Sequence, residues 1–152
     1  MTAAAFIQLG ARLMLVILFL PFSALDKIFN FRGAVGQAKQ ETPWRPIAVL
    51  LVIGGLAIEI FMSLAILTGI MDRLAAVILA IYCILTACLW KQFWNPPPHQ
   101  ALGARDLFWD FLKNFSLAGG FLLVALGTTA SSVRSFIADP FSSTHPYQDI
   151  RP

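Results

Sequence analysis

A glutamate lies near the middle of a long apolar stretch of this chain. Glu59 is the only charged residue in residues 46–70, a stretch long enough to cross a bilayer. A charged side chain at the centre of a membrane helix costs about 2.5–3.5 kcal/mol on the mildest scale, so such residues are usually paired, protonated or functional. Gly55 and Ser63, each four residues away, share its helix face. We expect Glu59 to face the bundle interior, where it serves a ligand or, alternatively, is a protonated or paired structural residue.

Five further polar residues lie near the ends of apolar stretches. Asp26 and Lys27 follow the first stretch, and Asp110, Lys113 and Asn114 open the last. The two ends fall on one side of the membrane, so we expect all five to converge on one rim of the bundle. For Asp26 and Lys27 the structural alternative is a solvated helix end, with Lys27 complementing the helix dipole. We expect Lys113, about 10 Å along its helix, to be partly desolvated and to hold Asp26, Asp110 or an anionic ligand rather than only to snorkel.

The cysteines and histidines do not form a recognisable metal or haem site. Cys83 and Cys88 are five residues apart on one predicted helix, about 140° apart around its axis, so they cannot bridge each other. We interpret both as buried apolar residues, which argues against a disulfide oxidase. His99 and His145 fall outside the apolar stretches, so they cannot hold a haem in the bilayer. We expect no metal and no covalently bound cofactor.

A stripe of Tyr82, Thr86 and Trp90 follows one face of the third apolar stretch, at a spacing of four residues. Packing is the simpler interpretation of this stripe. A quinone-like pocket is the alternative, because aromatic side chains with a few polar groups line many such sites.

Four apolar stretches must position these residues. Of the 152 residues, 58% are hydrophobic and 12% are charged, whereas about 25% are charged in a soluble protein. Irregular backbone is not tolerated in hydrocarbon, so the pattern predicts an all-α integral membrane four-helix bundle. The domain is predicted to cover residues 1–130, followed by a polar tail over 131–152. The predicted spans are about Phe6–Leu25, Pro46–Thr68, residues 74–90 and Asp106–Thr129.

The connections carry specific signals. Pro21 predicts a kink in the first span, and residues 34–40 predict a short interfacial helix. Gly69 predicts a left-handed helix cap, and Asp72 the next N-cap. The loop of residues 91–105 contains three consecutive prolines and is expected to be stiff. The tail shows no helical period, so we expect a partner chain to hold it rather than its own bundle.

The basic residues indicate an orientation rather than a nucleic-acid site. Seven of the eleven Lys and Arg lie in or near the first and third connections, and four lie on the other side. This asymmetry predicts cytoplasmic long connections and both termini outside. We expect a multi-pass protein of a bacterial or archaeal cytoplasmic (inner) membrane, surrounded by lipids. The first span resembles a signal-peptide core, and we expect it to be retained.

Four motifs together resemble the DoxX family, over nearly the whole chain up to about Gly127. They are Ser23-Ala-Leu-Asp-Lys27, Glu59 in a helix with Gly-Gly, Thr68-Gly-Ile-Met-Asp-Arg73, and Phe-Leu-Lys113-Asn114-Phe-Ser-Leu-Ala-Gly-Gly120. The family comprises small four-helix membrane proteins and takes its name from a subunit of a thiosulfate:quinone oxidoreductase. Other members are proposed partners of redox or stress systems. The resemblance implies a membrane component near quinone or sulfur redox chemistry. The triple-proline loop and the polar tail depart from the family pattern.

Two functions fit these features. In the first, the chain is a redox-associated subunit whose bundle binds a quinone or another lipophilic ligand. Glu59 would supply a proton or hydrogen bond, and Lys113 with Asn114 would position an anionic group. In the second, it is a non-catalytic subunit that anchors or stabilises a larger membrane complex. A small-solute transporter is least favoured, because four helices give little room for alternating access.

Overall fold

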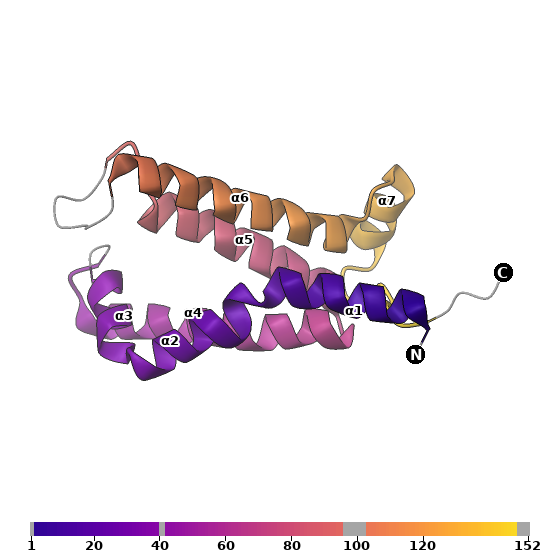
Figure 1. The fold of residues 1–152 in the computed structure, drawn as a ribbon, viewed down its shortest axis with the longest axis horizontal. Coiled ribbons are helices and arrows are strands. Elements are labelled where there is room, and N and C mark those ends of the chain that lie inside the picture. Colours follow the sequence, from indigo (N-terminus) through magenta and orange to yellow (C-terminus); the bar gives the residue numbers. More distant parts are fainter. Residues whose placement is uncertain (1, 40–41, 96–102, 149–152) are drawn as a thin grey trace.

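The computed structural model describes residues 2–39, 42–95 and 103–148, and Figure 1 shows their arrangement. These residues contain helices and no strand, and four spans are long and apolar enough to cross a membrane. The prediction of an all-α membrane bundle is therefore confirmed. The predicted stiff segment of residues 96–98 and His99 lie outside the described residues. The elements are α1 (Ala3–Val16), the π-helical turn η1 (Leu18–Ser23), α2 (Ala24–Phe29), α3 (Phe31–Ala38), α4 (Arg45–Thr68), α5 (Asp72–Trp90), α6 (Ala104–Leu126) and α7 (Ala130–Ala138).

The first span is broken in its middle, as Pro21 predicts. Leu20 leaves the helical region (φ −125°, ψ 113°), and the Leu20–Pro21 peptide is cis. Pro21 has no N–H to donate, so the helical hydrogen-bond ladder is interrupted there. The two halves consequently pack against different neighbours. α1 contacts α4 and α6, whereas α2 contacts α3 and α4.

The turn between α4 and α5 has one predicted cap and one unexpected residue. Gly69 is left-handed (φ 77°) and its N–H donates to the Ala65 carbonyl, which confirms the predicted helix cap. A Cβ at Gly69 would also lie 2.8 Å from Pro146. Met71, at φ 51°, precedes α5 in the N-cap position. The prediction of Asp72 as N-cap is wrong, because its carboxylate instead binds groups from outside the helix.

Small residues let α5 pack closely in the centre of the bundle. Ala75, Ala76, Ala80 and Cys83 are buried on α5 against the η1 turn and α6, and Figure 1 shows α5 and α6 side by side. The interpretation of Cys83 as a buried apolar residue is confirmed. Cys88 is exposed, so the same interpretation is wrong for it.

The glycine pair of α6, Gly119 and Gly120, contacts a neighbouring helix at one position. A Cβ at Gly120 would lie 3.0 Å from the Leu15 side chain, so Gly120 permits the close approach of α1. A Cβ at Gly119 would have no neighbour within 4 Å. One glycine of the pair therefore serves helix packing.

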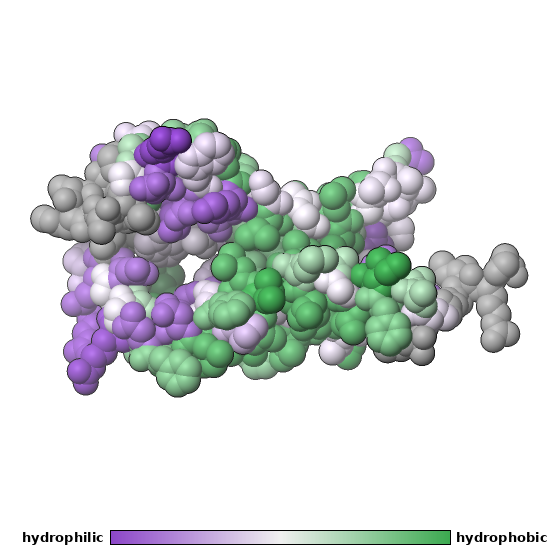
Figure 2. All heavy atoms as spheres, in the orientation of Figure 1, coloured by the Kyte–Doolittle hydropathy of each residue, from purple (hydrophilic) through white to green (hydrophobic). Residues whose placement is uncertain are grey.

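The two ends of the bundle differ in composition. α2, α3 and the start of α6 lie at one end, called here the α3 end, and α7 lies with both termini at the other, the α7 end (Figure 1). Figure 2 shows a broad hydrophobic surface towards the α7 end and polar side chains gathered at the α3 end. The predicted interfacial helix is α3, whose Val35 and Ala38 pack against Ala48 and Val52 of α4. That the termini lie outside the cell remains a prediction.

The carboxyl-terminal segment folds back onto its own bundle, so the prediction that only a partner holds it is wrong. It also contains a helix, because the Thr129 hydroxyl accepts from the Ser132 N–H and caps α7. Beyond α7, the Ser143 hydroxyl donates to the Gly69 carbonyl at 2.6 Å, and the Tyr147 hydroxyl donates to the Leu67 carbonyl. Polar groups at the end of the bundle thus hold the tail, and α7 shows that the prediction of a tail without helical structure is wrong. Docking of a further protein to this segment remains a prediction.

Candidate functional site

Glu59 is buried in the bundle and bound by three donors. Its side-chain Oε1 lies 2.5 Å from Lys27 Nζ, and accepts from the Ser23 hydroxyl at 3.0 Å and the Tyr82 hydroxyl at 2.9 Å. Lys27 Nζ also donates to Ser23 Oγ at 2.7 Å. The residue is 1% exposed, so the prediction that it faces the interior next to polar groups of other helices is confirmed. We call Ser23, Lys27, Glu59 and Tyr82 the Glu59 cluster.

Three separate parts of the chain build this cluster. Ser23 ends η1 and Lys27 lies four residues later on α2, so both side chains point to one side. Gly55 lies one turn before Glu59 on α4, and a Cβ there would come within 3.1 Å of the Tyr82 hydroxyl. The absence of a side chain at this position gives Tyr82 of α5 room to reach the carboxylate.

The cluster leaves two buried polar atoms unpaired. Within the described residues, Glu59 Oε2 and Ser63 Oγ have no hydrogen-bond partner. Ser63 is 0% exposed and lies one turn after Glu59 on the same face of α4. An unpaired buried polar atom costs about 1–3 kcal/mol. These two atoms, one turn apart on α4, are an acceptor and a hydroxyl that no group of the described residues uses.

An opening lies next to α2. Figure 2 shows this gap through the molecule near the α3 end, between the half that contains α1–α4 and the half that contains α5 and α6. Polar side chains border it in this view. The Lys27 side chain remains 21% exposed although its ammonium group contacts buried Glu59. The cluster is therefore not sealed from the surroundings of the bundle at this end.

A second polar group lies on the α3 end of α6. Asp110 accepts from Lys91 Nζ at 3.1 Å through one oxygen and from Lys113 Nζ at 3.2 Å through the other. The Asn114 amide donates to the Asp110 backbone carbonyl at 2.9 Å. The Lys113 side chain is 72% exposed. Lys113 thus pairs with Asp110, as one alternative predicted, but the expectation of partial desolvation is wrong. We call these four residues the Asp110 rim.

The predicted convergence of the polar residues is only partly correct. Lys27 joins Glu59, and Asp110, Lys113 and Asn114 join one another, all towards the α3 end. The structure shows no contact between these two groups among the described residues, and Asp26 is exposed on α2. The reason is that α2 packs against α3 and α4 instead of reaching α6. Sequence reasoning did not select Ser23 or Tyr82 as site residues, although Ser23 begins the Ser23–Lys27 motif and Tyr82 belongs to the stripe with Thr86 and Trp90.

Comparison with known proteins agrees with this architecture. The DoxX family profile matches residues 7–92, which include the first three spans and Glu59. The chain belongs to the DoxX family. It is similar to the inner membrane protein YphA of Escherichia coli (strain K12), with 29% identity over 116 residues, which cover 76% of this chain and 79% of YphA. No solved structure matches it. The chain is thus a multi-pass membrane protein of this family.

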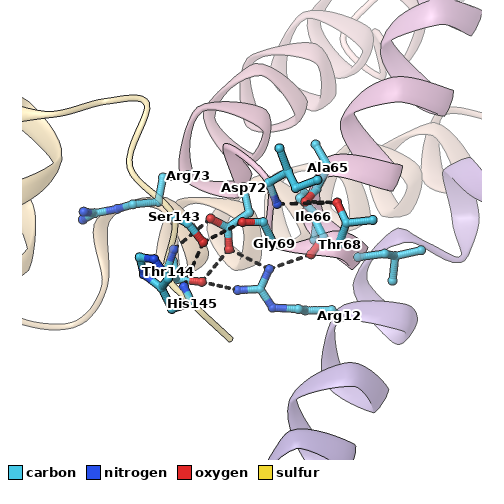
Figure 3. A network of polar contacts seen from close by, with 12 residues as sticks. Arg12, Ala65, Ile66, Thr68, Gly69, Asp72, Arg73, Ser143, Thr144 and His145 are labelled. Carbon is cyan, nitrogen blue, oxygen red and sulfur yellow. Dashed lines mark hydrogen bonds and ion pairs between the residues drawn. The ribbon is translucent and has the colours of Figure 1, made fainter. Parts of the chain in front are cut away.

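This DoxX-family chain holds a second buried ion pair, which is nearer the α7 end (Figure 3). Arg12 Nη1 lies 2.8 Å from Asp72 Oδ2 and donates to the Ile66 carbonyl at 2.6 Å. The Thr144 N–H of the tail donates to Asp72 Oδ1 at 2.9 Å, and the Thr144 hydroxyl donates to Asp72 Oδ2 at 2.5 Å. The same hydroxyl oxygen accepts from Arg12 Nη2. We call Arg12, Asp72 and Thr144 the Asp72 cluster. Its signal in the sequence is Arg12, a charge inside an apolar stretch just as Glu59 is.

The neighbouring Arg73 points away from this cluster, as Figure 3 shows. Its Nε donates to the Ala125 carbonyl at 2.8 Å and its Nη2 to the Ser132 carbonyl at 2.8 Å. Its Nη1 donates to the hydroxyls of Ser135 and Ser142 at 3.3 and 3.2 Å. Arg73 therefore joins the end of α6 to α7 and the tail. In the sequence it appeared only as part of the Thr68–Arg73 motif.

Proposed function

We propose that this DoxX-family chain is a membrane component of a quinone-linked redox system, and that its bundle binds a quinone or another lipophilic ligand beside Glu59. One observation supports this proposal more than any other. Glu59 Oε2 and Ser63 Oγ are buried, unpaired and one turn apart. A ligand hydroxyl would donate to Oε2, and a ligand carbonyl would accept from the serine hydroxyl.

The surroundings of these atoms favour a ligand that is mostly apolar. The ring of Phe19 meets that of Tyr82 edge to face, with 6.3 Å between centroids. Buried aliphatic side chains such as Ile66 and Leu79 belong to the core around α4 and α5. Sites for flat, lipophilic molecules are usually lined by such apolar side chains with a few polar groups that orient the ligand. Quinones have this composition, with two oxygens on an apolar ring.

The arrangement of donors also suits a carboxylate that must stay available. Lys27, Ser23 and Tyr82 all bind Oε1. Oε2 is thereby held in place while it remains free to accept a hydrogen bond. The opening beside α2 supplies a route to the ligand, and the exposed Lys113 with Asn114 would attract an anionic group to the same end. The link to a redox system comes from the family resemblance, and it is part of this proposal.

Binding of decylubiquinone to the purified full chain in lipid nanodiscs tests this proposal. Ser63→Ala removes an unpaired hydroxyl and no internal hydrogen bond, so the bundle should stay as stable as wild type. We expect affinity to fall roughly threefold to tenfold, the value of one hydrogen bond of about 0.5–1.5 kcal/mol. Asp110→Asn, on the Asp110 rim, serves as a control and should bind as wild type does.

Two results would contradict the proposal. One is the absence of saturable quinone binding by the wild-type chain. The other is an unchanged affinity in both Ser63→Ala and Glu59→Gln. If the chain then still co-purified with other membrane subunits, the anchoring function would replace the ligand-binding one.

A further inference from the structure

Arg73 carries a buried positive charge that no carboxylate balances. It is 8% exposed, and none of the ion pairs among the described residues includes it. The adjacent Asp72 points the other way and is bound by Arg12 and Thr144 (Figure 3). The partners of Arg73 are two carbonyls, two serine hydroxyls and the ring of Phe136, whose centroid is 5.4 Å from the guanidinium carbon, all of them neutral. A buried cation without a counter-ion attracts an anion.

The guanidinium also retains an unused donor. An arginine side chain has five N–H groups, and four bonds from Arg73 are formed here. The Nη2 atom makes one of them, with the Ser132 carbonyl, which leaves its second N–H without an acceptor in the described part of the chain. This donor is available to an oxygen from outside the protein.

A cavity of about 410 Å³ lies beside Arg73 at the α7 end. Hydroxyl groups line it from two segments, Ser131, Ser132 and Ser135 of α7 and Thr144 of the tail, and Val124 of α6 supplies an apolar wall. Ser131 and Ser132 belong to the first turn of α7, where backbone N–H groups and the helix dipole favour negative charge. The cavity is thus lined by one cation and by the serine hydroxyls of α7, whereas the Thr144 hydroxyl already donates to Asp72.

We propose that this cavity binds the phosphate group of an anionic phospholipid. The phosphate oxygens would accept from the free Arg73 N–H and from the serine hydroxyls. A lipid is favoured over free phosphate because α7 and the tail expose large apolar side chains at this end of the bundle. Ile137 of α7 is 71% exposed and Phe141 is 63% exposed, and the ends of α5 and α6 place them at the boundary of the membrane span. Acyl chains would lie against this surface while the headgroup occupies the cavity.

Lipid binding by the full chain, measured by native mass spectrometry from detergent, tests the proposal. Dioleoyl phosphatidylglycerol, dioleoyl phosphatidylcholine and inorganic phosphate are compared on the same preparation. Ser131→Asp adds a negative charge to the cavity wall but removes no bond of Arg73. Its matched control is Ala138→Asp, the same charge change at the exposed far end of α7. Circular dichroism of each variant checks that the bundle is intact.

We expect wild type to bind phosphatidylglycerol more tightly than phosphatidylcholine. In Ser131→Asp the affinity for phosphatidylglycerol should fall about tenfold or more, because the new carboxylate would repel the lipid phosphate. Ala138→Asp should bind within twofold of wild type. Equal binding of the two lipids by wild type, or unchanged binding by Ser131→Asp, overturns the proposal. Competition by millimolar inorganic phosphate against the lipid overturns the lipid assignment.

Discussion

The Glu59 cluster and the Asp72 cluster solve the same physical problem in different ways. Each buries a carboxylate and pairs it with a basic residue of the first span, Lys27 for one and Arg12 for the other. Both oxygens of Asp72 accept hydrogen bonds, whereas all three donors at Glu59 bind one oxygen. The Asp72 carboxylate is therefore fully bound, although Arg12 Nε is buried without a partner among the described residues. A buried acceptor left unpaired, such as Glu59 Oε2, costs stability. We therefore propose that the unused acceptor, and not burial, distinguishes a ligand-binding acid such as Glu59 from a structural acid such as Asp72.

Removal of Arg12 should have the largest effect. Arg12→Met leaves Asp72 as an unpaired buried charge, so we expect unfolding free energy to fall by about 3–5 kcal/mol. Thermal unfolding of the detergent-solubilised chain measures this loss. The double variant Arg12→Met with Asp72→Leu removes both charges and should recover part of it. Wild-type stability of the single variant would show that the Asp72 cluster is not structural.

Lys27→Met should lower the free energy of unfolding less than Arg12→Met does. This difference tests the comparison between the Glu59 cluster and the Asp72 cluster directly. Glu59 would keep the hydroxyls of Ser23 and Tyr82, and the open surroundings of Lys27 allow water to approach. We expect a loss of about 1–3 kcal/mol in the same unfolding assay. A larger loss than for Arg12→Met would reverse the proposed roles of the two clusters.

Gly55→Ala, compared with Gly54→Ala, distinguishes a steric effect on Tyr82 from the general effect of alanine on helix stability. The new Cβ would press on the Tyr82 hydroxyl at 3.1 Å, so Tyr82 must shift away from Glu59 and quinone affinity should fall a few-fold. Gly54→Ala is the matched control, because a Cβ there has no neighbour within 4 Å. It should leave binding unchanged and stabilise the helix by up to about 1 kcal/mol. Identical behaviour of the two variants in quinone binding would remove Tyr82 from the proposed site.

The smallest effect is expected on the Asp110 rim. Lys113 is largely exposed, and exposed ion pairs contribute about 0–1 kcal/mol. The free energy of unfolding of Lys113→Met should therefore lie within about 1 kcal/mol of the wild-type value, because Lys91 continues to bind Asp110. A loss as large as that of Lys27→Met would show that the rim is a buried site after all.

The sequence allowed the spans and the position of Glu59 to be predicted because both follow from the cost of polar groups in hydrocarbon. Apolar length gave the four helices, and the polar face of α4 gave the inward direction of Glu59. The partners of Glu59 depend on how α2 turns after Pro21 and on the space left at Gly55, and no local pattern contains this information. Lys27 was selected from its place at a helix end, and Tyr82 was set aside as a packing residue.

The Asp72 cluster was missed for a different reason. Asp72 follows a turn, where an N-cap is the commonest role for an aspartate. Its partners, Arg12 and Thr144, are 60 and 72 residues away in the sequence, and Thr144 lies in the segment predicted to be a polar tail. Arg12, like Glu59, is a charge inside an apolar stretch, where an unpaired charge is costly. Treating the two charges alike would have predicted a second buried pair, though not its closure by Thr144.

The contact between Thr144 and Arg12 has a consequence for biosynthesis. Thr144 is 132 residues after Arg12, and at about 5–20 residues per second the ribosome needs on the order of ten seconds to make that interval. Throughout this time the first span carries a basic side chain in the membrane, and Asp72 becomes fully hydrogen-bonded only when the last segment arrives. A chain that stops short of Thr144 keeps buried polar atoms uncapped. The hydrogen bonding around Arg12 and Asp72 is therefore complete only after Thr144 has been made.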